Sequence, residues 1–265
     1  MSYHWSRVVA RVSFVNCDPI FHGIEKNWEI LPAPPSWCTG HLLDKDCIVA
    51  PIPTADYAKN MERLQLIRGI GIVSDGAVGS VLLFSNTTLE KVQSIALPSD
   101  SSTSKLLLRY ILENQGMVKE YIEMGPDLDE MLQVADAALL IGDRAMDEAK
   151  RNPNKVIIDL GEAWKEITGL PMVFGVFATH RDAPTEIVAE LTKDLRGNLE
   201  SFLESSERRV EVISKTALRS GFSEEFIQLY FNQVSNKMDS IAEEGLVSFL
   251  TSVCQVSESP HWAPE

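Results

Sequence analysis

The chain has 265 residues, of which 45% are hydrophobic and 23% are charged, and its formal net charge is -14. This composition is ordinary for a globular protein, and the length allows one large domain or two smaller ones. Because the excess charge is negative, no binding to nucleic acid or to an anionic membrane surface is expected. An anionic small molecule stays possible where the site is locally positive, as at a helix N-terminus.

The spacing of cysteines and histidines predicts no metal site. The four cysteines lack a C-x-x-C spacing, and the five histidines lack an H-E-x-x-H pattern. Scattered cysteines in a chain of this size are typical of the reducing cytosol. Residues 1–10 contain no basic segment followed by an apolar one, and no apolar run approaches the roughly 20 residues of a membrane span. We therefore expect a cytoplasmic protein without a metal, and monomer and homodimer stay open as alternatives.

Apolar and β-branched runs predict six strands in the N-terminal part of the chain, at 8–15, 28–31, 47–52, 64–72, 78–84 and 94–97. Turn and capping residues separate these runs. Pro19 is placed to open a short helix, Ser36 to cap a helix that ends at Leu43, and Thr54 to cap a helical turn over 55–59.

The rest of the chain begins with a strand–loop–helix unit, in which residues 98–104 precede a helix with apolar residues at Leu106, Leu107, Tyr110 and Ile111. Apolar runs predict further strands at 121–124, 137–141, 156–160 and 172–178, and helices at 128–133 and 144–151. Beyond Pro184 the apolar spacing becomes helical, over 186–204, 222–234 and 238–250.

Strands that alternate with helices predict an α/β fold with a largely parallel sheet. The chain is expected to leave a first lobe near Ser94 and to return to it near Met172. The first lobe is then discontinuous, formed by residues 1–95 and 173–265, and residues 96–172 form the second lobe. A ligand cleft is expected between the two lobes.

Asp143 occupies the most informative position. It is the first polar residue after the apolar run 137–141 and Gly142, and a helical pattern follows at once. The carboxyl end of a buried strand is where open α/β sheets bind their ligands. The alternative is that Asp143 merely caps the next helix. Its position alone does not separate these two interpretations.

A cluster of hydroxyl residues, Ser101 to Ser104, stands at another predicted helix start, and Ser102, Thr103 and Ser104 are its candidate ligand-binding residues. The free backbone N–H groups of such a start attract a carboxylate or a phosphate. Ordinary N-capping is the alternative, but one cap needs a single hydroxyl, so the cluster favours a ligand site.

Two turns and one thiol are weaker candidates. Asn16 follows a predicted strand and can donate or accept through its amide, although an Asx-turn before Pro19 explains it equally simply. The turn 74–77 either directs backbone N–H groups at a ligand or is a plain turn that requires Gly76. Cys17 would need a histidine partner to act as a nucleophile, and the sequence indicates none.

Six motifs that occur in order carry a family resemblance: 12–17, 50–52, 74–81, 102–104, 138–143, and Trp164 followed by 168–174. Together they resemble the MqnA-type chorismate dehydratases of the futalosine route to menaquinone. The resemblance runs from about residue 7 to residue 178, and the C-terminal helices match only in general character. It implies a periplasmic-binding-protein-like type II fold of two α/β lobes, a cytosolic location, and a hydro-lyase without metal or organic cofactor.

The resemblance also implies a reaction, the removal of water from the dicarboxylate chorismate to give 3-[(1-carboxyvinyl)oxy]benzoate. Loss of the ring hydroxyl and of a neighbouring ring proton makes the ring aromatic, which drives the reaction. Asn16 and Asp143 are the expected catalytic residues, Asp143 as base or as the group that orients the leaving hydroxyl. A substrate carboxylate that acts as its own base is the alternative. The expected substrate-binding residues are Ser13, Ile52, Thr54, Gly76, Ala77, Val78, Ser102, Thr103 and Ser104.

Two departures and two rival functions stay open. Pro53 and Thr54 stand where the family usually has two serines, and Met172 replaces a usual aromatic residue. One rival is the sibling enzyme that cleaves a dehypoxanthine futalosine, which looks to have a histidine base where Asp143 stands. The other is a non-catalytic small-anion binding protein, which would normally be exported and carry a leader.

Overall fold

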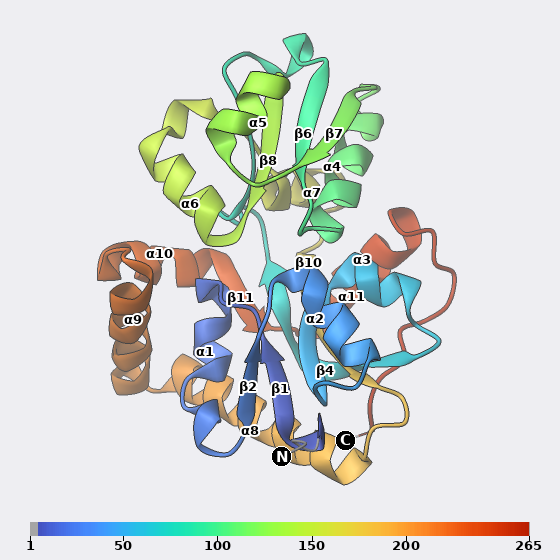
Figure 1. Cartoon of the computed structure of the whole chain (residues 1–265), viewed down its shortest axis with the longest axis vertical. Coiled ribbons are helices and arrows are strands. Elements are labelled where there is room, and N and C mark those ends of the chain that lie inside the picture. The colour runs from blue at the N-terminus through green and yellow to red at the C-terminus, as the bar shows by residue number, and fades with distance from the viewer. Residues whose placement is uncertain (1–4, 265) are drawn as a thin grey trace.

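The computed structural model describes residues 5–264, so residues 1–4 and 265, at the two ends of the expected first lobe, lie outside the described part. Figure 1 shows two lobes, one above the other along the longest axis of the molecule. Both ends of the chain lie in the lower lobe, and the middle of the chain forms the upper one. The expected two-lobed α/β fold is therefore observed.

The lower lobe contains six strands: β1 (Val8–Arg11), β2 (Glu29–Pro32), β3 (Val49–Pro53), β4 (Leu64–Ser74), β10 (Met172–His180) and β11 (Val234–Lys237). They form one sheet in the order β11-β4-β10-β3-β1-β2. Its helices are α1 (Asp18–Phe21), α2 (Pro35–Leu43), α3 (Thr54–Lys59), α8 (Thr185–Glu204), α9 (Ser206–Ser220), α10 (Glu224–Gln233) and α11 (Ser240–Ser252). Short 3-10 helices are η1 (Trp5–Arg7), η2 (Val15–Cys17) and η3 (Ile24–Lys26).

The upper lobe contains five strands: β5 (Val81–Ser85), β6 (Ser94–Pro98), β7 (Glu120–Met124), β8 (Ala137–Ile141) and β9 (Val156–Asp159). Their order in the sheet is β7-β6-β8-β5-β9. Its helices are α4 (Thr103–Asn114), α5 (Leu128–Val134), α6 (Gly142–Arg151) and α7 (Leu160–Thr168), with 3-10 helices η4 (Leu89–Lys91) and η5 (Pro153–Lys155). In Figure 1, α4 and α7 lie on one side of this lobe and α6 on the other.

The division between the lobes differs from the expected one at residue 95. β5 pairs with β8 and β9 and is buried throughout its length, so it is a central strand of the upper sheet. The chain therefore passes from the lower lobe to the upper one between Ser74, the last residue of β4, and Val81, the first residue of β5. The return lies between Thr168 and Met172, as the sequence predicts.

Both sheets are mixed, whereas the sequence predicts a largely parallel one. β10 is antiparallel to β3 and β4, and β5 is antiparallel to β8 and β9. The antiparallel pairs arise because the chain crosses between the lobes twice. β5 and β10 are the first strands after these crossings, so each begins near the cleft and runs away from the cleft. The pairs β1–β2, β1–β3, β6–β7 and β6–β8 are parallel, so the carboxyl ends of these strands meet at the cleft.

Two C-terminal elements, α9 and β11, are not predicted by the apolar pattern. Val210 and Leu218 of α9 are exposed, so the apolar residues of this helix do not form a single stripe. β11 is only four residues long and pairs with the edge of β4. Both elements depend on tertiary contacts that local periodicity does not reveal.

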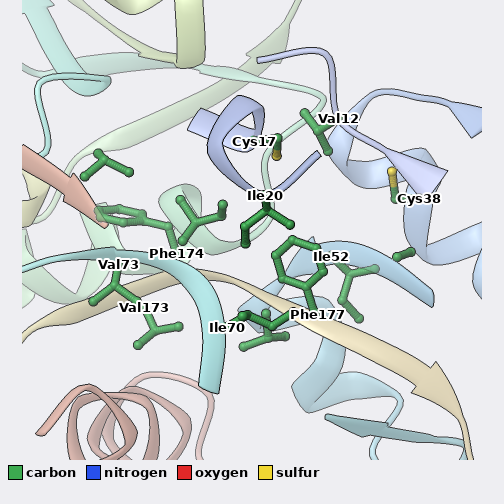
Figure 2. Packing of buried hydrophobic residues seen from close by; sticks show 14 of the residues in the cluster. Val12, Cys17, Ile20, Cys38, Ile52, Ile70, Val73, Val173, Phe174 and Phe177 are labelled. Carbon is green, nitrogen blue, oxygen red and sulfur yellow. The ribbon is translucent and has the colours of Figure 1, made fainter. Parts of the chain in front are cut away.

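A buried apolar cluster fixes the segment that follows β1. Figure 2 shows Ile20 close to Ile52 and Phe177, with Cys17 above them. All four side chains are at most 2% exposed. The Phe21 ring stacks on Phe177 with ring centroids 6.1 Å apart. Each large side chain that is fully buried contributes about 1.5–3 kcal/mol, so the turn that carries Asn16 rests on a rigid base.

A substitution at Gly245 tests the packing of the return crossing. A Cβ atom at Gly245 in α11 would lie 2.1 Å from the carbonyl oxygen of Pro171. Gly245→Ala is therefore expected to lower the free energy of unfolding by about 1–3 kcal/mol, since backbone must shift to relieve the overlap. Urea denaturation measures this change.

Gly197→Ala in α8 is the matched control, because nothing lies within 4 Å of the added Cβ atom. The higher helix propensity of alanine is expected to raise the free energy of unfolding by up to about 1 kcal/mol. The same sign of change in both variants would contradict the close approach at Pro171.

Candidate functional site

A pocket lies between the lobes, where the parallel strands end. It encloses about 640 Å³, space open to solvent included. Residues at or just beyond the carboxyl ends of β1, β3, β6 and β8 line it. This is the place at which open α/β sheets bind ligands, and the volume suits a small molecule.

Most of the pocket wall is apolar. Phe14, Ile52, Phe174 and Val81 contribute side chains from both lobes. Of the described residues in the lining, Asp100 is the one with a charged side chain. A planar apolar ring would fit between such walls, with its polar groups directed at a few fixed partners.

The start of α4 supplies hydroxyl groups and the backbone N–H groups of a first helical turn, which have no partner within the helix. Thr103 and Ser104 line the pocket, as does Ser101 just before the helix. Ser102 stands at the N-cap but makes no capping hydrogen bond, and its buried Oγ has no partner among residues 5–264. Ordinary capping therefore does not explain the Ser102 hydroxyl, and the positive end of the helix dipole lies at the pocket, where it would favour an anion.

Thr103 also connects the lobes. Its Oγ1 accepts a hydrogen bond of 3.1 Å from the backbone N–H of Ala55 in α3. The start of α4 in the upper lobe is thereby held against α3 of the lower one. The hydroxyl keeps its own proton for a further acceptor, such as a ligand carboxylate.

Asn16 lies in η2 and lines the pocket. Its buried Oδ1 has no hydrogen-bond partner in the described part of the chain, so the Asx-turn interpretation is not supported. The Tyr230 hydroxyl of α10 donates to Ser80 Oγ at 2.9 Å and interacts with the Asn16 side chain. Burial raises the pKa of Tyr230, so this hydroxyl stays protonated and holds the amide in place.

A buried cluster of charged residues around Asp18 holds the segment that carries Asn16. Asp18 is 7% exposed and accepts hydrogen bonds from Arg11, Arg219 and Thr216. Arg219 also donates to the backbone carbonyl of Ser13 at 2.9 Å. The C-terminal helix α9, which the sequence did not predict, thus fixes the loop that carries Phe14 and Asn16.

Asp143 is the second residue of α6 and does not cap the helix, because the N-cap position is Ile141. Its Oδ1 accepts a hydrogen bond of 3.0 Å from the backbone N–H of Val15, which joins the two lobes. Burial raises the pKa of the Asp143 carboxyl to about 6, although the Val15 N–H and Arg219 act against the rise. The neighbours Ile141 and Gly142 line the pocket, and Asp143 lies just beyond its lining.

Gly142 permits this contact. Its φ is +65°, and a Cβ atom there would lie 2.6 Å from the Phe14 ring. Any other residue would be strained in this conformation and would push the two lobes apart at Phe14.

A family comparison now bears on this geometry. The model of a family described as menaquinone biosynthesis matches residues 8–254. The chain belongs to this menaquinone biosynthesis family. A curated relative, the chorismate dehydratase of Thermus thermophilus, is 28% identical over 220 residues, which are 75% of this chain and 81% of the relative.

Solved structures agree on the fold of this menaquinone biosynthesis family member. Protein AF1704 from Archaeoglobus fulgidus has a TM-score of 0.77 and 19% identity, with coverage of 94% of this chain and 96% of that one. The alkanesulfonate-binding protein SsuA from Xanthomonas axonopodis pv. citri, bound to MOPS, has a TM-score of 0.67 and 14% identity, with coverage of 97% and 96%. A Candida albicans protein, the CA3427 gene product, described as having the generic periplasmic binding protein fold, has a TM-score of 0.68 and 15% identity, with coverage of 95% and 91%. The expected periplasmic-binding-protein-like fold is confirmed.

The pocket brings together some of the expected site residues. Those in its lining are Asn16, Ile52, Val78, Thr103 and Ser104. Those outside it are Ser13, Thr54, Gly76, Ala77, Ser102 and Asp143. Ser101, from the same hydroxyl cluster, also lines the pocket. The lining residues Ser80 and Asp100 and the supporting Tyr230 are absent from the expected set, although the position of Asp100 after β6 was a usable signal. The roles of all these residues stay predictions.

A carboxylate holds the two residues that follow the turn 74–77. The backbone N–H groups of Val78 and Gly79 donate to the Asp159 carboxylate at 2.7–3.1 Å. Asp159 also caps α7 by accepting from Gly161 and Glu162. One carboxylate therefore binds the segment that leads from the lower lobe to the upper one, and the N–H groups of Val78 and Gly79 already have a partner.

The departures from the family pattern lie on the pocket wall and in the core. Pro53 lines the pocket, whereas the Thr54 hydroxyl donates to the Val173 carbonyl at 2.6 Å. Met172 is fully buried. Burial raises the pKa of the Cys17 thiol to about 12, so near neutral pH it stays protonated and is not an activated nucleophile.

Metal-binding clusters and membrane spans are both absent from residues 5–264. No group of three or more histidine, cysteine, aspartate or glutamate side chains is placed there to hold a metal ion. No helix in this part of the chain is long and apolar enough to span a membrane.

Asp143→Asn is expected to change how stability depends on pH. The pKa of Asp143 rises from 3.8 to about 6 on folding, so the folded state binds this proton more tightly than the unfolded state. Stability is therefore lost as the pH rises from about 4 through about 6. The asparagine removes this loss and keeps an oxygen for the Val15 N–H.

The variant should exceed the wild type in unfolding free energy by about 1–3 kcal/mol at pH 8, with the difference vanishing near pH 4. Urea denaturation at several pH values measures it. A pH-independent difference would show that the Asp143 carboxyl titrates as an exposed one.

Proposed function

We propose that this chain is a chorismate dehydratase, a cytoplasmic carbon–oxygen lyase of the futalosine route that converts chorismate to 3-[(1-carboxyvinyl)oxy]benzoate and water. Family membership and the chorismate dehydratase relative support the assignment. The observation that carries it is the pocket itself. It combines apolar walls with an unpartnered amide oxygen of Asn16 and the hydroxyl-rich start of α4.

Each polar feature of the pocket suits one part of this substrate. The ring carboxylate would lie at the start of α4, against the Thr103 and Ser104 hydroxyls and the helix N–H groups. The ring would lie between Phe14 and Phe174. The proton to be lost is vinylogous to the ring carboxylate, so charge that develops on that carboxylate is stabilised by the positive end of α4.

The geometry favours a substrate carboxylate as the base. Asp143 lies beyond the pocket lining, and its Oδ1 is already bonded to the Val15 N–H. Asn16 borders the pocket with a free Oδ1 and is held by Tyr230. We assign Asn16 to orienting the reacting groups, and Asp143 to holding η2 against α6 while the side-chain carboxylate of the substrate takes the proton.

Incubation of the purified chain with chorismate tests the function. A new aromatic absorbance and a product mass lower by one water are expected. Neither binding nor turnover would overturn the proposal, and binding without turnover would favour a small-anion binding protein. Turnover of dehypoxanthine futalosine instead of chorismate would identify the sibling enzyme.

Two variants separate the roles of Asn16 and Asp143. Asn16→Leu keeps the size of the side chain without its polar atoms and is expected to lower kcat by about 100-fold or more. Asp143→Asn keeps the acceptor for Val15 and is expected to lower kcat by less than about 10-fold. Steady-state kinetics measures both, with unfolding curves as the control for folding.

A fall of about 100-fold to 10,000-fold in kcat for Asp143→Asn is typical of a lost general base. That result would contradict the assignment and make Asp143 the base.

A further inference from the structure

Asp100 has one carboxylate oxygen bonded and one without a partner. It lies between β6 and α4 and lines the pocket. Its Oδ2 accepts a hydrogen bond from the Arg144 guanidinium. Its Oδ1 is buried and has no hydrogen-bond partner anywhere in residues 5–264.

A buried acceptor without a donor is rare in folded proteins and needs an explanation. At the edge of a pocket, a ligand that brings a donor provides one. The same oxygen repels a carboxylate, because both groups are negative. The part of the ligand that faces Asp100 is therefore a hydrogen-bond donor and not an acid group.

The pocket lining thus combines two features of opposite preference. The start of α4, with Thr103 and Ser104, favours a carboxylate. Asp100 stands only a few residues before it, but its charge is offset by Arg144. The ion pair prevents Asp100 from cancelling the positive end of the helix and leaves Oδ1 as a local acceptor.

We propose that Asp100 is the specificity-determining residue that accepts a hydrogen bond from the ring hydroxyl of the substrate. This inference rests on the proposed function, in which that hydroxyl is the group that leaves. Asp100 selects a hydroxylated dicarboxylate over one without a hydroxyl, and it fixes the direction of the carbon–oxygen bond relative to Asn16.

Arg144 is the positioning residue for Asp100. It follows Asp143 in α6, so the helix that contacts Val15 also carries the guanidinium that binds Asp100 Oδ2. The Arg144 Nε is likewise buried and without a partner in the described residues, so the ion pair is made through one end of the guanidinium.

The substrate and the product form a natural pair of probes, since both carry two carboxylates but only chorismate carries the ring hydroxyl. In Asp100→Ala, the KM for chorismate is expected to rise about 10-fold or more. The inhibition constant of 3-[(1-carboxyvinyl)oxy]benzoate should stay within about twofold or fall, because a repulsive charge is removed. Asp100→Asn keeps the volume of the side chain. It should change the ratio of the KM for chorismate to the inhibition constant of the product by a smaller factor than Asp100→Ala.

Arg144→Gln should change the ratio of the two constants in the same direction, because the Asp100 carboxylate loses its fixed orientation. Asp129→Asn is the matched control, an exposed aspartate on α5 of the same lobe, and should leave both constants unchanged. These measurements use the full chain and steady-state kinetics with product inhibition.

Equal weakening of both ligands in Asp100→Ala and Asp100→Asn would show a structural role and overturn the inference. Unchanged constants for both ligands would also overturn it, because Asp100 would then contact neither. If the wild-type chain does not convert chorismate, the proposed function fails and the inference fails with it. If the wild type converts chorismate and the ratio does not move, only the inference fails.

Discussion

The contact between η2 and the start of α6 is the constraint on which the site depends. The Val15 N–H donates to Asp143 across the cleft, and the Phe14 ring lies against Gly142 where a side chain would not fit. These two contacts set the distance between the lobes at the position of Asn16. A ligand that fills the pocket therefore meets walls whose separation is already fixed, which lowers the cost of ordering it.

The described lining of the pocket includes no lysine or arginine. The arginines nearest to the η2 segment, Arg11 and Arg219, are both bonded to Asp18, and Arg144 is bonded to Asp100. The remaining positive potential comes from the start of α4, whose N–H groups are fixed by the backbone. Such groups need no reorganisation when charge develops on a ligand, which is the property that electrostatic catalysis requires.

The polar residues at strand ends could be predicted from the sequence, because a carboxyl end is visible wherever an apolar run stops. Asn16, Thr103 and Ser104 were found in this way, and all three line the pocket. The partner of each could not be predicted. Asp143 pairs with Val15, 128 residues earlier, and only the closed fold brings the two together.

The same limit explains the errors in the fold. β5 was placed in the first lobe because nothing local marks the crossing before it, and its reversed direction follows from that crossing. The turn at Gly76 was expected at the ligand because its composition suits exposed N–H groups. The next two N–H groups, those of Val78 and Gly79, have a carboxylate partner in Asp159, 80 residues or more along the chain.

Asp159 holds together the two segments that cross between the lobes. It accepts from Val78 and Gly79 on the outgoing crossing and caps α7, which leads into the return crossing. Gly161 packs so closely on this crossing that a Cβ atom would lie 2.5 Å from the Gly76 carbonyl oxygen. Because the Asp159 carboxylate binds one crossing segment and caps the helix that leads into the other, it limits how the lobes can rotate relative to each other. The lobes are therefore joined at the crossings through Asp159, at the η2–α6 contact and at the hydrogen bond from Ala55 to Thr103. The last two contacts border the pocket, so the elements that line it also fix the lobes relative to each other.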